Sequence, residues 1–311
     1  MDNNSTTEFP IRGRLLIVDG HAYAYRAFFA IRSLSSPTGT ATNAIYGFIR
    51  MLGKMQARIK PSHVLVVWDG GLAQERMTLL PAYKAQRAEM PLELGPQLDQ
   101  IVEYLGAAGI CSYMKESCEA DDCIAAMAKQ AVEAGWEVII ASSDKDFMQL
   151  VSPQVWMLNT NDRSEALWGA EEVKGKTGVE PTQIVDWLSL MGDTVDNIPG
   201  VPGVGPKTAT ELLRQFGSID ELYRRLPEVR SERIRASLEA AGESVRRNQQ
   251  LVRLNCDVPC GVGLEATALK AEDEEALRRL FSGWGFKTML HELEEAATRP
   301  KDFFDEKAGV R

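Results

Sequence analysis

The sequence has few cysteines and no long apolar run, and these absences exclude whole classes of protein. Its 311 residues include five cysteines without regular spacing, which argues against a disulfide framework and fits a reducing cytoplasm. No window approaches about 18 uncharged apolar residues, so we expect no transmembrane helix and no membrane partner. The polar start lacks the apolar core of a secretory signal, and we expect residues 1–13 to form a short disordered leader.

The composition is that of a soluble globular protein, with 44% hydrophobic and 25% charged residues. The length suits one large domain or two of ordinary size. The formal net charge of −9, taken alone, argues against a nucleic-acid partner. The charge is unevenly distributed, however, because residues 201–255 carry ten Lys and Arg against seven Asp and Glu.

Four continuous apolar runs predict strands that are covered on both faces, as in a parallel sheet. These runs are 14–20, 63–70, 137–144 and 154–159. Helical patterns separate them, so we predict an α/β fold with a doubly wound sheet. From about residue 180 the strand signal fades. We therefore place an α/β domain at 14–180, a helical region at 181–296 and a polar tail at 297–311.

Acidic residues follow three of the predicted strands. Asp19 and Asp69 end the first two strands, Asp144 follows the third, and Asp146 comes two residues later. Each acid alone suits an ordinary turn. Ligands of open α/β sheets bind beyond the carboxyl ends of the strands, so three acids at equivalent positions indicate a shared site.

A second group of acids, Glu119, Asp121 and Asp122, opens a helical pattern. Acids favour a helix N-terminus through capping and the helix dipole, which accounts for one or two of them. Asp121 also heads the apolar stripe of the helix, which predicts that it points inward toward the strand-end acids. A buried carboxylate needs a cation or a metal as a partner.

A third pair, Asp193 and Asp196, is three residues apart and suits either a capped turn or a shared ligand. The nine acids have no His or Cys at ligand spacing, so oxygen-only ligation favours Mg²⁺ or Mn²⁺. Nine carboxylates indicate two metals about 4 Å apart, as in phosphodiester hydrolysis. Cys118 and Cys123 flank the second group, but no matching pair exists and we assign them to packing.

A glycine-rich turn, GVPGVGPKTA, precedes a helix with Lys207 in its first turn. Glycines let the backbone approach a ligand closely, and a helix N-terminus offers free N–H groups to phosphate. A dinucleotide fingerprint would need a preceding strand, which is absent from the pattern. We therefore predict a grip on a nucleic-acid backbone, with a plain structural turn as the alternative.

The stretch between Asp69 and Glu119 interleaves basic and aromatic residues, which suits phosphate contact and base stacking or, alternatively, a solvated helical face. Its candidates are Arg76, Tyr83, Lys84 and Arg87. Just after Asp19, Tyr25 and Arg26 are expected near the same edge of the sheet, whereas Phe28 and Phe29 are expected in the core.

Together these motifs resemble the 5′ nuclease family, and most closely the 5′→3′ exonuclease domain of bacterial DNA polymerase I. The resemblance runs from about residue 14 to 296, and its most specific pieces are LLIVDGHAYAYRAF, YKAQR, CEADDCIA, SSDKDFMQLV and GDTVDNIPGVPGVGPKTA. It implies a PIN-like fold with a C-terminal helix–hairpin–helix and a helical arch at about 71–95. It is compatible with a stand-alone exonuclease and with an excised N-terminal domain, and the complete-looking tail slightly favours the former.

The resemblance also implies the roles of the site residues. The first Mg²⁺ would be held by Asp19, Asp69, Glu119, Asp121 and Asp122, and the second by Asp144, Asp146, Asp193 and Asp196. Lys84 and Arg87 would contact the scissile phosphate and, with Asp69 and Asp144, form the catalytic set. Tyr25, Arg26, Arg76, Tyr83, Gly203, Gly205 and Lys207 would contact DNA, and the hairpin would hold K⁺.

The function implied is a structure-specific 5′→3′ exonuclease and 5′-flap endonuclease, active in primer removal, nick translation and repair. Its partners would be branched or nicked duplex DNA, RNA–DNA primer junctions and a separate DNA polymerase, and we expect a monomer associated with the nucleoid. Departures from the family pattern at Glu75, Leu80, Met148 and Val195 remove no metal ligand. The rival functions are a non-catalytic DNA-binding protein on the same fold and a small-molecule phosphohydrolase.

Overall fold

A computed structural model describes residues 12–158 and 166–298 of the chain. Its main sheet has the strand order β3-β2-β1-β4-β5-β6, with β1 to β5 parallel and β6 antiparallel to β5. The strands are β1 (Arg14–Asp19), β2 (His63–Trp68), β3 (Cys111–Met114), β4 (Glu137–Ala141), β5 (Val155–Leu158) and β6 (Leu167–Trp168). Asp19 pairs in register with Val67, so the carboxyl ends of neighbouring strands meet at one edge.

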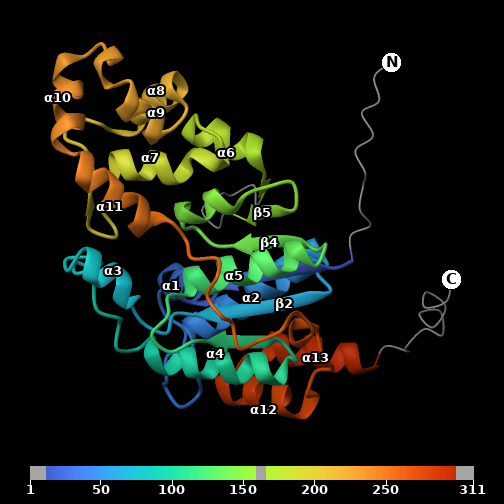
Figure 1. The fold of residues 1–311 in the computed structure, drawn as a ribbon. Coiled ribbons are helices and arrows are strands. Elements are labelled where there is room, and N and C mark those ends of the chain that lie inside the picture. The colour runs from blue at the N-terminus through green and yellow to red at the C-terminus, as the bar shows by residue number, and fades with distance from the viewer. Residues whose placement is uncertain (1–11, 159–165, 299–311) are drawn as a thin grey trace, which may run out of the picture.

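Helices cover both faces of this sheet (Figure 1). Alternate strand residues such as Leu16 and Val18 pack against one layer, and Leu15 and Ile17 pack against the other. The first layer holds α1 (Gly20–Ala30), α2 (Asn43–Ile59), α4 (Gly95–Ala107), α12 (Glu274–Trp284) and α13 (Lys287–Thr298), and the second holds α5 (Ala120–Glu133). This two-sided burial explains why the strands read as continuous apolar runs.

The helical region lies at one end of the sheet, on the side of β5 and α5 (Figure 1). Its helices are α6 (Ala170–Thr177), α7 (Ile184–Met191), α8 (Pro206–Phe216), α9 (Ile219–Arg224), α10 (Glu232–Ala240) and α11 (Gly242–Val252). A two-stranded hairpin of β7 (Gly192–Asp193) and β8 (Ile198–Pro199) connects α7 toward α8. Short 3-10 helices are η1 (Lys145–Leu150), η2 (Pro181–Gln183), η3 (Leu226–Glu228) and η4 (Leu264–Thr267).

After α11 the chain returns across α5 and ends its described part beside α4, at the opposite end of the sheet (Figure 1). Several contacts hold the returning segment, and two of them lie near its middle. Lys129 on α5 lies 2.6 Å from Asp257, and the N–H of Gly261 donates to the Tyr113 hydroxyl at 2.8 Å. The sequence region 181–296 is therefore divided in space between the helical region and the sheet.

The α/β fold class and the four predicted strands agree with this architecture. Strand β3 was not predicted from the sequence, because CSYM is a short edge strand without an apolar run. Among the described helices, none has the length and apolarity that a membrane span requires. The predicted leader at 1–13 and tail at 297–311 lie almost entirely outside the described residues.

Candidate active site

Asp19 ends β1 at the carboxyl edge of the sheet and caps α1. One carboxylate oxygen accepts a hydrogen bond from the N–H of Ala22 at 3.0 Å, and the other accepts one from the Ser142 hydroxyl at 2.9 Å. Burial, together with the nearby charges of Asp144 and Asp69 and against the two hydrogen bonds, raises the pKa of Asp19 to about 6. Acids from three strand ends therefore do gather here, as the sequence pattern indicates.

Asp146, Asp193 and Asp196 form a compact triad whose carboxylate oxygens lie within 4.8 Å of one another. Asp144 caps η1 by accepting from the N–H of Asp146 at 2.9 Å, which turns Asp146 toward the other two acids. Burial, followed by the charges of Asp144 and Asp196, raises the pKa of Asp146 well above its usual range. Burial likewise raises the pKa of Asp196 to about 6.

The donor set of this triad fits a divalent cation. All its ligand atoms are carboxylate oxygens, the donors that Mg²⁺ and Mn²⁺ prefer. The Oδ1 atom of Asp146 is buried and has no hydrogen-bond partner, which is costly for a polar atom unless a ligand satisfies it. Within the described parts of the chain, this triad is the one group of acidic, histidine or cysteine side chains whose ligand atoms all lie within 4.8 Å of one another.

Glu119 stands at the start of α5 with both carboxylate oxygens engaged. Oε2 accepts from Lys84 Nζ at 2.5 Å and from the Tyr83 hydroxyl at 3.1 Å. Oε1 accepts from the N–H of Ala73 at 3.2 Å. Burial raises the pKa of Glu119, but the charges of Lys84 and Arg76 outweigh it and the pKa is lowered.

Asp121, in the first turn of α5, faces the strand-end acids. Burial, followed by the charge of Asp144, raises its pKa well above the usual range, and Asp19 adds to the effect. Lys84 Nζ lies 3.9 Å from its Oδ2. The apolar stripe predicted behind it is buried at Ile124.

Asp122 lies on another face of α5, away from this gathering. It forms a two-pronged ion pair with Arg76, with N–O distances of 2.6 and 2.8 Å, and accepts from the N–H of Asn255 at 2.8 Å. Both of its oxygens are therefore engaged by protein groups. Arg76, which the sequence assigned to DNA, is only 6% exposed, so the structure brings neither residue to the open surface of the site.

The segment expected to form an arch is helical in α3 (Gln74–Leu79) and a series of turns over 81–86. Tyr83 is buried, and Lys84 is 9% exposed with a positive φ of 52°. Arg87 is exposed, with Nη1 3.3 Å from Asp69 Oδ2. The two cations predicted to bind phosphate thus both contact carboxylates of the site.

Near Asp19, α1 presents part of an exposed surface. Arg26 is exposed and Tyr25 is half-buried, with its ring centroid 6.4 Å from that of Phe29. The expectation that Phe29 lies in the core is wrong, because its side chain is 68% exposed. Phe28 packs partly against the core.

The glycine-rich turn joins β8 to α8, and two buried valines within it form backbone hydrogen bonds that fix its shape. The N–H of Val201 donates to the Leu190 carbonyl at 2.8 Å, and that of Val204 to Val201 at 2.9 Å. Gly203 is exposed with a φ of 81°, which favours glycine. Gly205 and Lys207 are also exposed, so all three predicted DNA contacts of the turn face outward.

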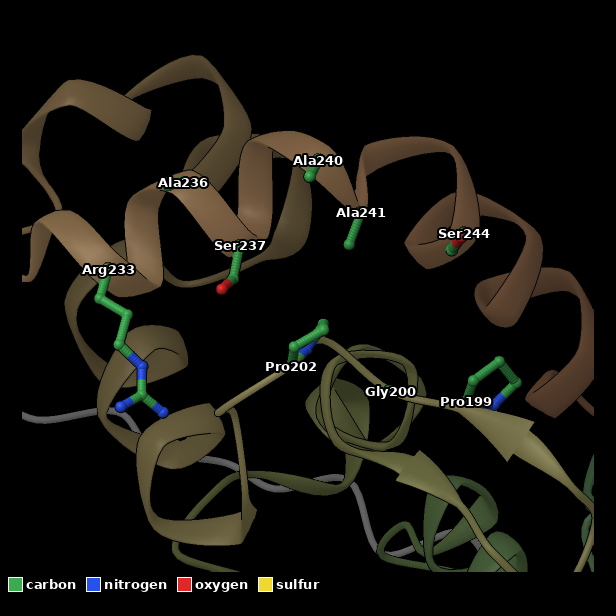
Figure 2. A pocket seen from close by; sticks show the side chains of 9 residues that line it. All are labelled: Pro199, Gly200, Pro202, Arg233, Ala236, Ser237, Ala240, Ala241 and Ser244. Carbon is green, nitrogen blue, oxygen red and sulfur yellow. The ribbon is translucent and has the colours of Figure 1, made fainter.

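A groove of about 630 Å³ runs between this turn and the α10–α11 helices (Figure 2). β8 contributes Pro199, the turn contributes Gly200 and Pro202, and α10 contributes Arg233 and a row of small residues. A Cβ atom at Gly203 would lie 3.1 Å from a guanidinium nitrogen of Arg233, which puts this cation beside the turn.

Two residues beside the acids escaped the sequence reasoning. His21 Nδ1 accepts from the N–H of Asp69 at 3.1 Å, and burial lowers its pKa. Lys145 Nζ lies 3.1 Å from Asp193 Oδ2. The sequence could have indicated them only by position, since His21 comes two residues after Asp19 and Lys145 directly follows Asp144.

The thiols at the start of α5 are buried, in agreement with their assignment to packing. The sulfur atoms of Cys118 and Cys123 lie 3.4 Å apart within the core.

Comparisons with known proteins identify families and structures that resemble this chain. A family model described as the 5′-3′ exonuclease N-terminal resolvase-like domain matches residues 14–178, and one described as the 5′-3′ exonuclease C-terminal SAM fold matches residues 179–275.

Among curated relatives, DNA polymerase I of Bacillus caldotenax is 38% identical over 290 residues, which are 93% of this chain and 33% of that protein. A 5′-3′ exonuclease of Aquifex aeolicus is 37% identical over 281 residues, covering 90% of this chain and 95% of that protein. The chain therefore spans about a third of the length of the DNA polymerase I relatives and nearly the whole length of the Aquifex relative.

Solved structures share the fold. A complex of the bacteriophage T5 D15 flap endonuclease with DNA and metal ions has a TM-score of 0.66 at 21% identity, covering 92% of this chain and all of that one. The catalytic core of Rad2 with a DNA substrate has a TM-score of 0.60 at 16% identity, covering 93% of each chain. The predicted fold, an α/β sheet with a C-terminal helical region, is thereby confirmed.

Proposed function

Because this chain belongs to the 5′-3′ exonuclease family, we propose that it hydrolyses phosphodiesters at 5′ ends and 5′ flaps of duplex DNA. The observation that carries this proposal is the buried triad with the unpartnered Oδ1 of Asp146. Carboxylates held this close repel one another, and divalent cations at the site would turn the repulsion into binding free energy.

We assign two divalent cations to the site, normally Mg²⁺, with Mn²⁺ as a substitute. Asp144 and the triad would hold one cation, and Asp19, Asp69, Asp121 and Glu119 would hold the other. We assign Asp122 to the support of Arg76, since it pairs with that guanidinium through both oxygens on a face of α5 away from the other acids. When bound, the cations would activate a water and offset the charge of the phosphate.

Lys84 and Arg87 would stabilise the negative charge that develops on the phosphate. In the structure they are paired with Glu119 and Asp69. A cation that takes these carboxylates would leave the two basic groups available to the phosphate oxygens. The pairing thus keeps two needed positive charges at the site before the substrate arrives.

The exposed turn with Gly203, Gly205 and Lys207, joined by Arg233 across the groove, would hold the backbone of the duplex. Backbone carbonyls of the turn would hold K⁺. Nicked and flapped DNA and RNA–DNA primer junctions would be the substrates, as primer removal, nick translation and repair require. A DNA polymerase would be the partner of a monomeric protein in the bacterial cytoplasm, at the nucleoid.

Cleavage of a 5′-flap duplex labelled at either end tests the proposal. With Mg²⁺ we expect 5′-phosphate and 3′-hydroxyl products, and with EDTA none. Asp144→Ala should bind the flap duplex and cut it poorly. Binding without Mg²⁺-dependent cleavage would instead favour a non-catalytic DNA-binding protein, and cleavage of p-nitrophenyl phosphate in preference to the flap would favour a small-molecule phosphohydrolase.

A further inference from the structure

Arg76 has more protein contacts than an ion pair requires. It lies on α3 with a buried side chain, and its guanidinium faces five acceptor atoms. Nη1 and Nη2 donate to the two oxygens of Asp122, and Nη1 also lies 3.3 Å from Glu119 Oε1. Nε donates to the Leu251 carbonyl at 3.0 Å, and Nη2 to the Arg253 carbonyl at 3.1 Å. Four of the five N–H groups of the guanidinium donate hydrogen bonds to protein atoms, and the side chain is only 6% exposed, so little of it is open to a DNA phosphate.

These acceptors belong to two different parts of the fold. Asp122 and Glu119 stand at the start of α5, among the acids of the site. The two carbonyls belong to the segment 251–255, which runs from the end of α11 toward α5. Gln149 on η1 binds the same segment, through the Val252 carbonyl at 3.0 Å and the Leu254 N–H at 3.0 Å.

Helix α11, which leads into the segment 251–255, also contacts the end of β8, directly before the glycine-rich turn. Asn248 on α11 is fully buried, and its amide donates to the Ser189 carbonyl at 3.1 Å and to the Pro199 carbonyl at 2.8 Å. Arg76 therefore stands where the base of the arch segment, the start of α5 and the end of α11 meet.

Arg76 and Lys84 contact different carboxylate oxygens of Glu119. Lys84 and Tyr83 contact Oε2, whereas Arg76 and the N–H of Ala73 contact Oε1. Without Arg76, Glu119 would lose a charged contact on one side and could rotate toward Lys84. A site of this kind needs its groups fixed to within about 0.5 Å.

We infer that Arg76 is a positioning residue, which fixes Glu119, and through it Lys84, against the end of α11 without contacting DNA. The inference rests on the proposed nuclease function. It also gives Asp122 a role, since Asp122 holds the guanidinium in the orientation that reaches Glu119. Supporting groups of this type typically change activity by about 10–100-fold when they are removed.

The test compares Arg76→Gln with two controls under saturating and limiting flap DNA. Gln149→Leu loosens the same segment without touching Glu119. Arg14→Gln removes an equal charge at the start of β1, where Arg14 pairs with Glu137 at 2.6 Å. Circular dichroism sets an assay temperature at which every variant is folded. If Arg76→Gln does not fold, Arg76→Lys replaces it in the test. Lysine retains the positive charge beside Asp122 but lacks the planar set of donors that a guanidinium presents.

We expect the Arg76 variant to lose about 10–100-fold in kcat with KM changed by less than about threefold, and both controls to keep kcat within about threefold. A raised KM with unchanged kcat and a smaller salt dependence would overturn the inference in favour of a DNA contact. Equal kcat losses in Arg76→Gln and Gln149→Leu, in step with their melting temperatures, would overturn it in favour of a merely structural role. Wild-type protein without Mg²⁺-dependent cleavage would instead refute the proposed function itself.

Discussion

Lys84 Nζ lies 2.5 Å from Oε2 of Glu119, so a cation assigned to the phosphate is paired with a carboxylate assigned to a metal. Burial lowers the pKa of Lys84, but the charges of Asp121 and Glu119 outweigh it and the pKa is raised. The ammonium group therefore stays charged at neutral pH. It would compete with the proposed metal for the same oxygens, so the state of this pair should affect both cation binding and catalysis.

Replacing Lys84 by Met should strengthen divalent-cation binding in the absence of DNA and weaken catalysis. The variant removes the ammonium group that would compete with a cation for Glu119. It also removes the positive charge proposed to stabilise the phosphate, so kcat should fall by about 10²–10³-fold. Calorimetric titration with Mn²⁺ measures the first effect, and single-turnover flap cleavage measures the second. Cation affinity equal to that of the wild type would contradict the competition.

Replacing Asp146 by Asn should stabilise the cation-free protein and abolish most of its stabilisation by cations. The change removes a buried charge that Asp193 and Asp196 repel. A gain of about 1 kcal/mol corresponds to a rise of about 2–4 °C in Tm for a chain of this size. Thermal melts in EDTA and in Mn²⁺ measure both effects, with Asp186→Asn on the outer helical region as the control. A lower Tm in EDTA would argue against repulsion in the triad.

Stability in EDTA should fall as the pH rises from about 4 to about 6. Burial raises the pKa of Asp19 from its ordinary value of 3.8 to about 6, so the folded state binds more protons than the unfolded state over this range. Since stability rises with pH only where the unfolded state binds more protons, this group opposes folding more strongly as it ionises. Divalent cations should therefore raise Tm more at about pH 8 than at about pH 5. Thermal melts at both pH values, with and without Mn²⁺, measure this difference. An equal rise in Tm at the two pH values would contradict the prediction.

Lys207→Gln and Arg233→Gln should each weaken binding of flap DNA without changing kcat at saturation. Each removes one cation beside the turn, so the slope of log K against log salt should shrink by about 0.9 for each phosphate that the variant no longer neutralises. Fluorescence anisotropy from about 50 to 200 mM KCl measures the slope. Arg224→Gln is the control, because Arg224 already pairs with Glu221 on the surface of α9. An unchanged slope for Arg233→Gln would remove that residue from the proposed DNA surface.

Much of the fold was readable from the sequence, because buried parallel strands leave continuous apolar runs. The acids at their ends were readable for the same reason, since a strand end in an α/β sheet has a known place. Strand β3 was not, because its four residues combine half-buried and exposed positions at the edge of the sheet.

Pairings between distant segments were beyond sequence reasoning. Arg76 and Asp122 are 46 residues apart, and a basic residue beside an aromatic one suits a DNA surface as well as a buried ion pair. Helical spacing predicted that Asp121 faces the strand-end acids, and in the structure Asp121 lies near Asp144 while Asp122 pairs with Arg76. The exposure of Phe29 was missed because an aromatic residue in a helical pattern usually marks the core.

The path of the chain after α11 affects how the protein can fold during synthesis. The helical layer over one face of the sheet is completed by α12, with the buried residues Leu277, Phe281 and Trp284, and by α13, with the buried residues Met289 and Leu293. Helix α4, which contacts α12, is synthesised more than 160 residues earlier, so the apolar surface that it offers to α12 stays uncovered until α12 is made. A nascent chain that stops before α12 would expose that surface, and it is this intermediate, more than the finished protein, that would be prone to aggregate.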